Sequence, residues 1–316
     1  MAGRWRSRCG LDHPRRGLLE MNQEYLKPEV VSRLARLDLI ARLVVEGFIT
    51  GLHQSPYHGF SVEFSEYRQY MPGDSLRDLD WKVLGKTDRL YVKQYEEETN
   101  LKSHLLIDAS ASMAYGSDAI TKYQYASYTA AALSHLMLRQ RDAVGLIAFD
   151  DRIRTYLQPR SVTSHLHTLL TTLQNTSPEG TDTDLAATFH ELAERIVRRG
   201  LVIVISDLFD DPDRLLNGLK HFRHRNHEVI VFHILDPRER DLDFNREMRF
   251  VDLESGTQIA TEPWHLAPEY RDHMETLINR FRRECREAMI DYVLLETSEP
   301  FDTALFNYLA KRKKLM

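Results

Sequence analysis

The sequence predicts an α/β fold in which a doubly wound, mainly parallel sheet is flanked by helices. Four short runs are continuously apolar, as strands buried on both faces of a parallel sheet are. They lie at residues 105–107, 143–149, 201–205 and 229–235. Segments with helical periodicity separate these runs, which is the alternation of a doubly wound sheet. With 316 residues, of which 42% are hydrophobic, the chain is long enough to bury a large core.

The chain before the first run is predicted to contain three units. We expect residues 1–20 to be a disordered extension or the result of a misassigned start, because they are rich in arginine and lack an apolar signal segment. Apolar residues spaced by three and four predict a helix in residues 21–50 that ends near Gly47. Residues 51–100 are predicted to form a small β-rich module, in which an exposed Trp81 would provide a second contact surface.

Residues 101–312 are expected to form the α/β domain. Its predicted helices span residues 121–139 and 162–173, a stretch from Asp184 to a glycine stop at Gly200, a stretch from Pro212, and residues 268–289 and 303–311. Residues 152–157 and 292–295 are predicted as further strands. A turn at residues 254–256 predicts a β-hairpin inserted at residues 241–262.

Composition excludes several classes of function. Lysine and arginine total 42 and aspartate and glutamate 47, so the formal net charge is −5 and the chain lacks the basic character of a nucleic-acid binder. Cys9 and Cys285 offer neither a metal-binding spacing nor a disulfide framework, which fits a reducing cytoplasm. No apolar run approaches the ~20 residues of a transmembrane helix. We therefore expect a cytoplasmic protein with no transmembrane segment and no nucleic-acid partner.

Polar side chains gather where the predicted strands end. Asp108, Ser110 and Ser112 follow the first run, and Asp207 follows the run at 201–205. The carboxyl ends of parallel strands meet at one sheet edge, where the loop that contains Thr181 is also expected. Two carboxylates and three hydroxyls are hard oxygen ligands that suit Mg²⁺, or Mn²⁺, and leave room for an outside ligand. The alternative is that the two serines only cap a helix.

The pattern Asp-x-Ser-x-Ser, followed by Gly-Thr and then Ser-Asp, resembles the metal-ion-dependent adhesion site of von Willebrand factor type A domains. The resemblance assigns the metal ligands as Asp108, Ser110, Ser112, Thr181 and Asp207, with no catalytic or cofactor-binding residue. Leu208 departs from the pattern, because many such domains have glycine after the last aspartate. The implied fold is a von Willebrand type A-like domain preceded by a helix and a small β-rich module.

A second block of residues is similar to the bacterial family called domain of unknown function 58. It comprises Arg68, Tyr70, Pro72-Gly73-Asp74, Asp80-Trp81-Lys82, Tyr91-Val92-Lys93 and Glu96-Glu97-Glu98. The resemblance runs from about residue 25 to 309. Members are often encoded beside a MoxR-type AAA+ ATPase and have no established enzymatic activity.

These resemblances imply a non-enzymatic adaptor. Its Mg²⁺ would coordinate an acidic residue of a protein partner, and it would act with a MoxR-type ATPase on an unknown client in protein maturation or remodelling. The alternative function is a metal-assisted hydrolase or phosphotransferase that uses the same aspartate, serine and threonine side chains.

Two further groups of residues invite alternative interpretations. The histidines His221, His224 and His227 form either a second metal site or, as we expect, a solvated helix terminus. Asp182 and Asp184 are either helix caps or outer groups of the metal site, whereas Asp210 and Asp211 are expected to cap the next helix.

Overall fold

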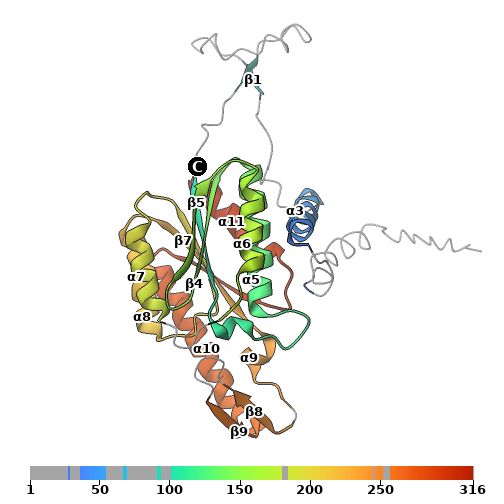
Figure 1. Ribbon diagram of the computed structural model, residues 1–316, viewed down its shortest axis with the longest axis vertical. Helices are drawn as coiled ribbons and strands as arrows, with labels where there is room; N and C mark the ends of the chain where they lie inside the picture. The colour runs from blue at the N-terminus through green and yellow to red at the C-terminus, as the bar shows by residue number, and fades with distance from the viewer. Residues whose placement is uncertain are drawn as a thin grey trace, which may run out of the picture.

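A six-stranded sheet forms the centre of the computed structural model (Figure 1). Its strands are β3 (Lys102–Asp108), β4 (Ala143–Phe149), β5 (Ile153–Arg160), β6 (Leu201–Ser206), β7 (Glu228–Leu235) and β10 (Asp291–Glu296). They are ordered β10–β7–β6–β3–β4–β5, and β5, at one edge, is antiparallel to its neighbour while the other pairs are parallel. This topology confirms the predicted mainly parallel α/β fold.

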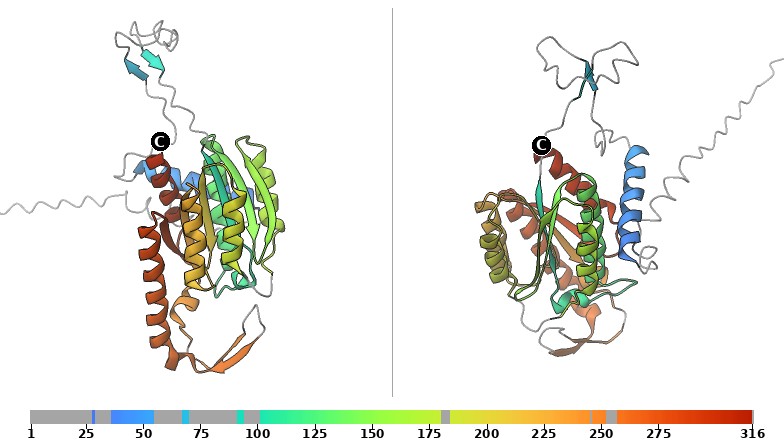
Figure 2. Two further views of the ribbon diagram at one scale, coloured as in Figure 1. Left: turned by 90° about the vertical axis from the view of Figure 1, so that its left-hand side faces the viewer. Right: turned by 45° about the horizontal axis from the view of Figure 1, so that its top comes forward.

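Helices cover both faces of the sheet (Figure 2). One face packs against α3 (Leu37–Gln54), α5 (Lys122–Arg139), α6 (His165–Asn175) and α11 (Asp302–Leu315). The other packs against α7 (Leu185–Arg195), α8 (Pro212–His224) and α10 (Pro263–Glu287). The sheet is therefore the middle of three layers.

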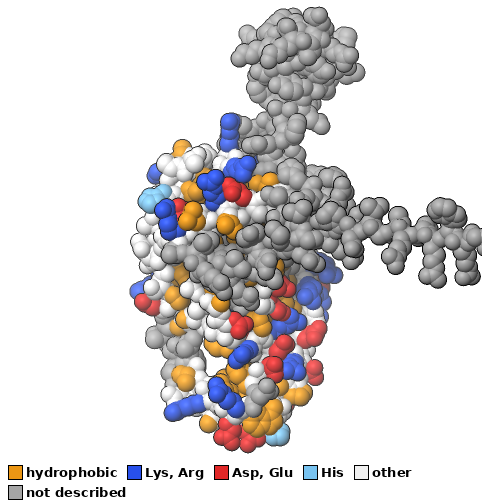
Figure 3. Space-filling view, turned by 90° about the vertical axis from the view of Figure 1, so that its right-hand side faces the viewer, with side chains coloured by type: hydrophobic (Ala, Val, Ile, Leu, Met, Phe, Trp, Pro, Cys, Tyr) orange, Lys and Arg blue, Asp and Glu red, His pale blue; other side chains and the backbone are white. Residues whose placement is uncertain are grey.

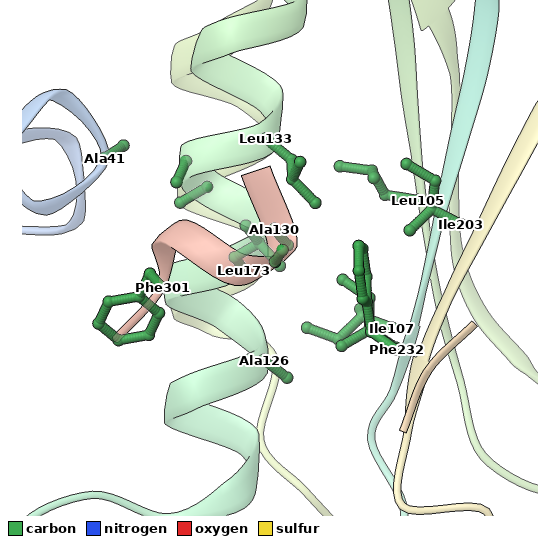
Figure 4. Packing of buried hydrophobic residues seen from close by; sticks show 14 of the residues in the cluster. Ala41, Leu105, Ile107, Ala126, Ala130, Leu133, Leu173, Ile203, Phe232 and Phe301 are labelled. Atoms are coloured by element: carbon green, nitrogen blue, oxygen red, sulfur yellow. The ribbon is translucent and has the colours of Figure 1, made fainter. Parts of the chain in front are cut away.

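Side-chain alternation along the strands supplies a hydrophobic core on each face of the sheet. We call the core on the face covered by α5 the first core and the core on the face covered by α8 the second core. In β3, Leu105 and Ile107 belong to the first core and Leu106 to the second, because successive side chains of a strand point to opposite faces. Figure 4 shows Leu105 and Ile107 facing Ala130 and Leu133 of α5. Since both faces of the central strands are covered, these strands have continuous apolar sequences.

The structure describes Pro28 and residues 36–54, 67–69, 91–93, 101–179, 184–244, 246–251 and 257–315. Residues 1–20 and most of the module at 51–100, including Trp81, lie outside this part of the chain. Within the module, β1 (Tyr67–Gln69) pairs antiparallel with β2 (Tyr91–Lys93). In the region of the predicted insertion, β8 (Met248–Val251) pairs antiparallel with β9 (Gln258–Thr261), and α9 (Pro237–Asp241) precedes them.

The predicted end of α3 and the predicted start of α10 are wrong. The helix α3 continues through Gly47 to Gln54, because Phe48 is buried and Ile49 packs against the first core, which outweighs the cost of about 1 kcal/mol for a helical glycine. The helix α10 begins at Pro263 rather than at Pro268, which lies inside it. Pro263 is the better first residue because a missing N–H costs nothing there.

None of the helices in the described part of the chain has the length and apolar character needed to cross a membrane.

Because two histidines are buried, we expect the free energy of unfolding to fall in acid. Burial lowers the pKa of His104 and of His233 to about 4, whereas an unfolded histidine titrates near 6.5. The stabilising effect of keeping each ring neutral is complete above pH 6.5 and is lost as the pH falls toward 4. We expect each histidine to lower the free energy of unfolding by about 2 kcal/mol between pH 7 and pH 5.

Urea unfolding of the wild type and of His104→Leu at both pH values measures this effect. The free energy of unfolding of the variant should fall by about 2 kcal/mol less between the two pH values than that of the wild type, and the matched substitution His273→Leu, at an exposed position of α10, should leave this fall unchanged. An identical pH dependence in His104→Leu and wild type would show that His104 does not titrate as its burial requires.

Candidate functional site

The first half of the site follows the central strand β3. Asp108 is its last residue and has no solvent exposure. Asp108 Oδ1 accepts a hydrogen bond of 2.9 Å from the Ser110 N–H, and Oδ2 accepts one of 2.5 Å from Ser206 Oγ. The Ser110 and Ser112 hydroxyl oxygens lie 3.0 Å apart. One carboxylate and two hydroxyls therefore converge at the end of β3.

The second half follows β6, the parallel neighbour of β3. Ile107 is in register with Ile205, so the residues after both strands emerge side by side. Asp207 is buried there, and its Oδ1 accepts a hydrogen bond of 3.3 Å from the Phe209 N–H. The structure thus brings together Asp108, Ser110, Ser112 and Asp207, which we call the strand-end site.

Leu208 explains why glycine suits the position after Asp207. Its φ angle is 54°, in the left-handed region that costs a residue with a Cβ about 1–2 kcal/mol. Its N–H donates a 2.9 Å hydrogen bond to Ser206 Oγ, and its side chain is buried in the second core. Burial of a leucine side chain, worth about 1.5–3 kcal/mol, offsets the backbone cost.

A lysine that sequence reasoning missed enters this site. Lys122, at the start of α5, is fully buried, and its ammonium group lies 2.7 Å from Asp207 Oδ2 and 2.8 Å from Glu239 Oε1 of α9. The Phe209 ring centroid is 4.7 Å away. Burial acts to lower the pKa of Lys122, but the charges of Asp207 and Glu239 outweigh it and raise the pKa above its usual value.

The charges of this cluster do not balance. Lys122 compensates one of the three carboxylates of Asp108, Asp207 and Glu239, so two negative charges remain when all three are ionised. Burial, and then the charge of Asp207, raise the pKa of Asp108 to about 7. One divalent cation would neutralise the excess, and the donor set of carboxylate and hydroxyl oxygens is the type that Mg²⁺ and Mn²⁺ prefer. The residues present therefore fit the predicted ion.

Two predicted members of the site, Thr181 and Asp182, lie outside the described residues. Glu179, the last described residue before them, donates a 3.0 Å backbone hydrogen bond to the carbonyl of Ala109, next to Asp108. After the gap, Asp184 caps α7 by accepting a 2.9 Å hydrogen bond from the Ala187 N–H, which makes Asp184 a helix cap.

The alternative roles of the other residues are also decided by contacts. Ser110 occupies the N-cap position of a short 3₁₀ helix, η2 (Ala111–Ala114), but its side chain makes no capping hydrogen bond. Asp211 caps α8 as predicted. The expectation that Asp210 also caps α8 is wrong, because Asp210 accepts hydrogen bonds from the N–H groups of Asp211 and Ala186, which lie outside this helix.

The three histidines do not assemble a second metal site. His227 is buried and its Nε2 lies 2.9 Å from the Ile196 carbonyl oxygen, while His221 contacts His190 and Glu194. The prediction of a wholly solvated histidine cluster is therefore wrong for His227. In the part of the chain that the structure describes, no three His, Cys, Asp or Glu side chains form a metal-binding group, so a metal site there would need hydroxyl ligands.

Sequence reasoning also missed Asp236, which follows β7. Its carboxylate accepts hydrogen bonds of 2.8 and 2.7 Å from the N–H and hydroxyl of Ser117, and one of 2.9 Å from the Arg238 N–H. It thereby ties the loop before α5 to the start of α9. The sequence does contain a pattern that indicates Asp236, because an aspartate stands at the carboxyl end of β3, β4, β6 and β7 alike. Lys122 was detectable too, since a cation in the first turn of a helix opposes the helix dipole.

Comparison with known proteins agrees with the resemblance seen in the sequence. Residues 66–283 match the family described as "Protein of unknown function DUF58". Uncharacterized protein Rv1480 of Mycobacterium tuberculosis (strain ATCC 25618 / H37Rv) is 28% identical over 293 residues, which are 91% of this chain and 91% of that protein. Uncharacterized protein Mb1516 of Mycobacterium bovis shows the same identity and coverage.

Two solved structures are among the similar ones. The conserved hypothetical protein BatB from Bacteroides thetaiotaomicron has a TM-score of 0.47 and 17% identity, over 67% of this chain and 99% of that one. The SpRpn10 VWA domain has a TM-score of 0.37 and 12% identity, over 66% of this chain and 94% of that one. The family match alone spans well over half of the sequence. The chain therefore belongs to the DUF58 family.

Proposed function

We propose that this protein is a non-enzymatic, metal-dependent protein-binding adaptor. Asp108, Ser110, Ser112, Thr181 and Asp207 would hold Mg²⁺, with Mn²⁺ as a substitute. The ion would coordinate an acidic residue of a partner protein. The observation that carries the proposal is the convergence of two buried carboxylates, Asp108 and Asp207, with the hydroxyls of Ser110 and Ser112 at the strand-end site.

The chemistry of the ligands supports capture of a carboxylate. Two carboxylates bring only enough charge to neutralise a divalent ion, and hydroxyl ligands add none. An ion held in this way stays electrophilic and favours an anionic outside ligand. Ser112, which is half-buried whereas Ser110 is buried, marks the side from which that ligand would approach.

The proposed partner is a MoxR-type AAA+ ATPase, with which the adaptor would act on a client during maturation or remodelling. The choice of this partner follows from the resemblance of the chain to the DUF58 family. The proposed location is the cytoplasm, as expected from the low cysteine content of the sequence.

Capture of the MoxR-type ATPase encoded nearest to this chain tests the proposal. The full chain should retain the ATPase in Mg²⁺ and lose it in EDTA, and Asp108→Asn should lose it in both. Asp142→Asn is the matched control, because Asp142 is also buried at a strand end, next to the start of β4, but pairs with Arg312. Its capture should equal that of the wild type. Capture that survives EDTA and Asp108→Asn would remove the ion from the mechanism.

The same preparation addresses the alternative function. A hydrolase or phosphotransferase would turn over a phosphate ester such as p-nitrophenyl phosphate in Mg²⁺, with loss of turnover in Asp108→Asn. We expect no turnover above that of the variant. A rate that depends on both Mg²⁺ and Asp108 would replace the adaptor by an enzyme.

A further inference from the structure

A pocket of about 540 Å³ lies beside the strand-end site. It is formed by α9, the β8–β9 hairpin and the first turns of α10, and its volume is typical of ligand pockets. Ser112 of the strand-end site lines it, as does Glu239, the partner of Lys122. A ligand held at the site would therefore extend directly into this pocket.

The wall opposite the strand-end site is apolar. It includes Phe244, Phe250, Val251, Ile259 and Leu266. Val251, Ile259 and Leu266 keep 47%, 62% and 47% of their surface exposed. Figure 3 shows hydrophobic side chains beside acidic and basic ones at the lower end of the molecule, where β8 and β9 lie in Figure 1. Exposed apolar side chains beside a polar site are typical of an interaction surface.

One cationic side chain also lines the pocket, next to the acidic Glu239. Arg238 lines it, with its guanidinium 5.9 Å from the Phe244 ring centroid. Within the described ranges, Arg238 forms no ion pair with an acidic side chain. An arginine without an acidic partner on an apolar wall attracts a carboxylate, as a divalent ion at the neighbouring site would.

The hairpin offers backbone groups to an extended chain. The strands β8 and β9 form a two-stranded sheet, so among the described residues each pairs along only one edge. Such an edge can pair with an extended peptide. This feature favours a segment of a protein over a small molecule as the occupant.

We propose that this pocket recognises an extended protein segment in which an acidic residue and a large apolar residue stand two positions apart. The two side chains point to the same side of an extended segment, so the carboxylate reaches the strand-end site while the apolar side chain enters the pocket. The proposal rests on the proposed metal-dependent function, and it assigns a sequence preference to the partner.

Binding of labelled nine-residue peptides to the full chain tests this preference by fluorescence anisotropy. One peptide carries Asp and Phe two positions apart in a Gly/Ser background, a second has Ser in place of Phe, and a third has Asn in place of Asp. In Mg²⁺ we expect the first to bind about tenfold more tightly than either of the others. Ile259→Ser should weaken the Phe peptide about tenfold and leave the Ser peptide unchanged, since the two changes remove the same contact.

Met289→Ser is the matched control, because Met289 is 69% exposed and lies outside this pocket. It should bind every peptide as the wild type does. Equal affinity for the Phe and Ser peptides, with both lost in EDTA, would overturn the pocket and leave the metal site standing. A Phe peptide that binds equally in EDTA but is weakened by Ile259→Ser would support the pocket and contradict the metal-dependent function.

The same purified proteins also test two other possible occupants of the pocket. Light scattering that shows a dimer, abolished by Ile259→Ser, would assign the surface to a second copy of this chain. Octanoate that displaces the Phe peptide at equal concentration would assign it to small amphipathic molecules. Either result would overturn the proposal.

Discussion

Replacing Lys122 with methionine is expected to destabilise the protein by about 3–5 kcal/mol, because it leaves the buried carboxylate of Asp207 and the half-buried carboxylate of Glu239 without their cation. Lys122 is the shared partner of Asp207 and Glu239, at 2.7 and 2.8 Å. Urea unfolding in EDTA measures the loss. Mg²⁺ should restore more stability to the variant than to the wild type, since the ion supplies the positive charge that Asp207 has lost.

Two further variants separate this buried cluster from ordinary surface pairing. Lys122→Met combined with Glu239→Gln should recover part of the loss, because one of the stranded charges is removed. Lys220→Met, which breaks a partly exposed pair with Glu284, should cost at most about 1 kcal/mol. If Lys122→Met proves as stable as Lys220→Met, the buried charge cluster does not exist as described.

Asp108→Asn is expected to change stability and metal binding in opposite directions. Asparagine keeps an oxygen to accept the Ser110 N–H and removes a buried charge that lies near Asp207, where burial and repulsion raise the pKa of Asp108 to about 7. At pH 8 the metal-free variant should therefore be more stable than the metal-free wild type. Its affinity for Mg²⁺ should fall at least about 100-fold, or ~2.7 kcal/mol.

Thermal unfolding with and without Mg²⁺, together with calorimetric titration, gives both quantities. The substitution Asp150→Asn, in contrast, should lower the stability of the metal-free protein. Burial acts to raise the pKa of Asp150, but the hydrogen bond from Arg154 outweighs it and lowers the pKa, so this substitution removes a favourable charge. Its effect on stability should therefore be opposite in sign to that of Asp108→Asn. An Asp108→Asn variant that is less stable yet binds Mg²⁺ normally would make Asp108 a structural residue.

The sheet was predictable because its signal is local. Strands with both faces buried have continuous apolar sequences, and an aspartate that ends such a run at Asp108 or Asp207 must lie at the sheet edge. The register of Ile107 with Ile205 then places the two together. Nothing beyond strand direction was needed to assemble these members of the strand-end site.

The features of the fold and of the site that were not predicted depend on contacts between segments far apart in the sequence. Glu239 reaches Lys122 because α9 folds back over the start of α5, and no local pattern specifies that path. The helix α7 ends at Arg195 instead of Gly200. Gly200 is needed for a different reason, because a Cβ there would lie 2.2 Å from the Lys102 carbonyl oxygen. The place of Thr181 remains a prediction.

Anomalous diffraction from crystals grown with Mn²⁺ would locate the proposed ion. We expect a manganese peak held by the oxygens of Asp108, Ser110, Ser112 and Asp207, directly or through water, with the Lys122–Glu239 pair intact. Crystals that show Mn²⁺ elsewhere, or none at the strand-end site under the same conditions, would contradict a metal-dependent adaptor.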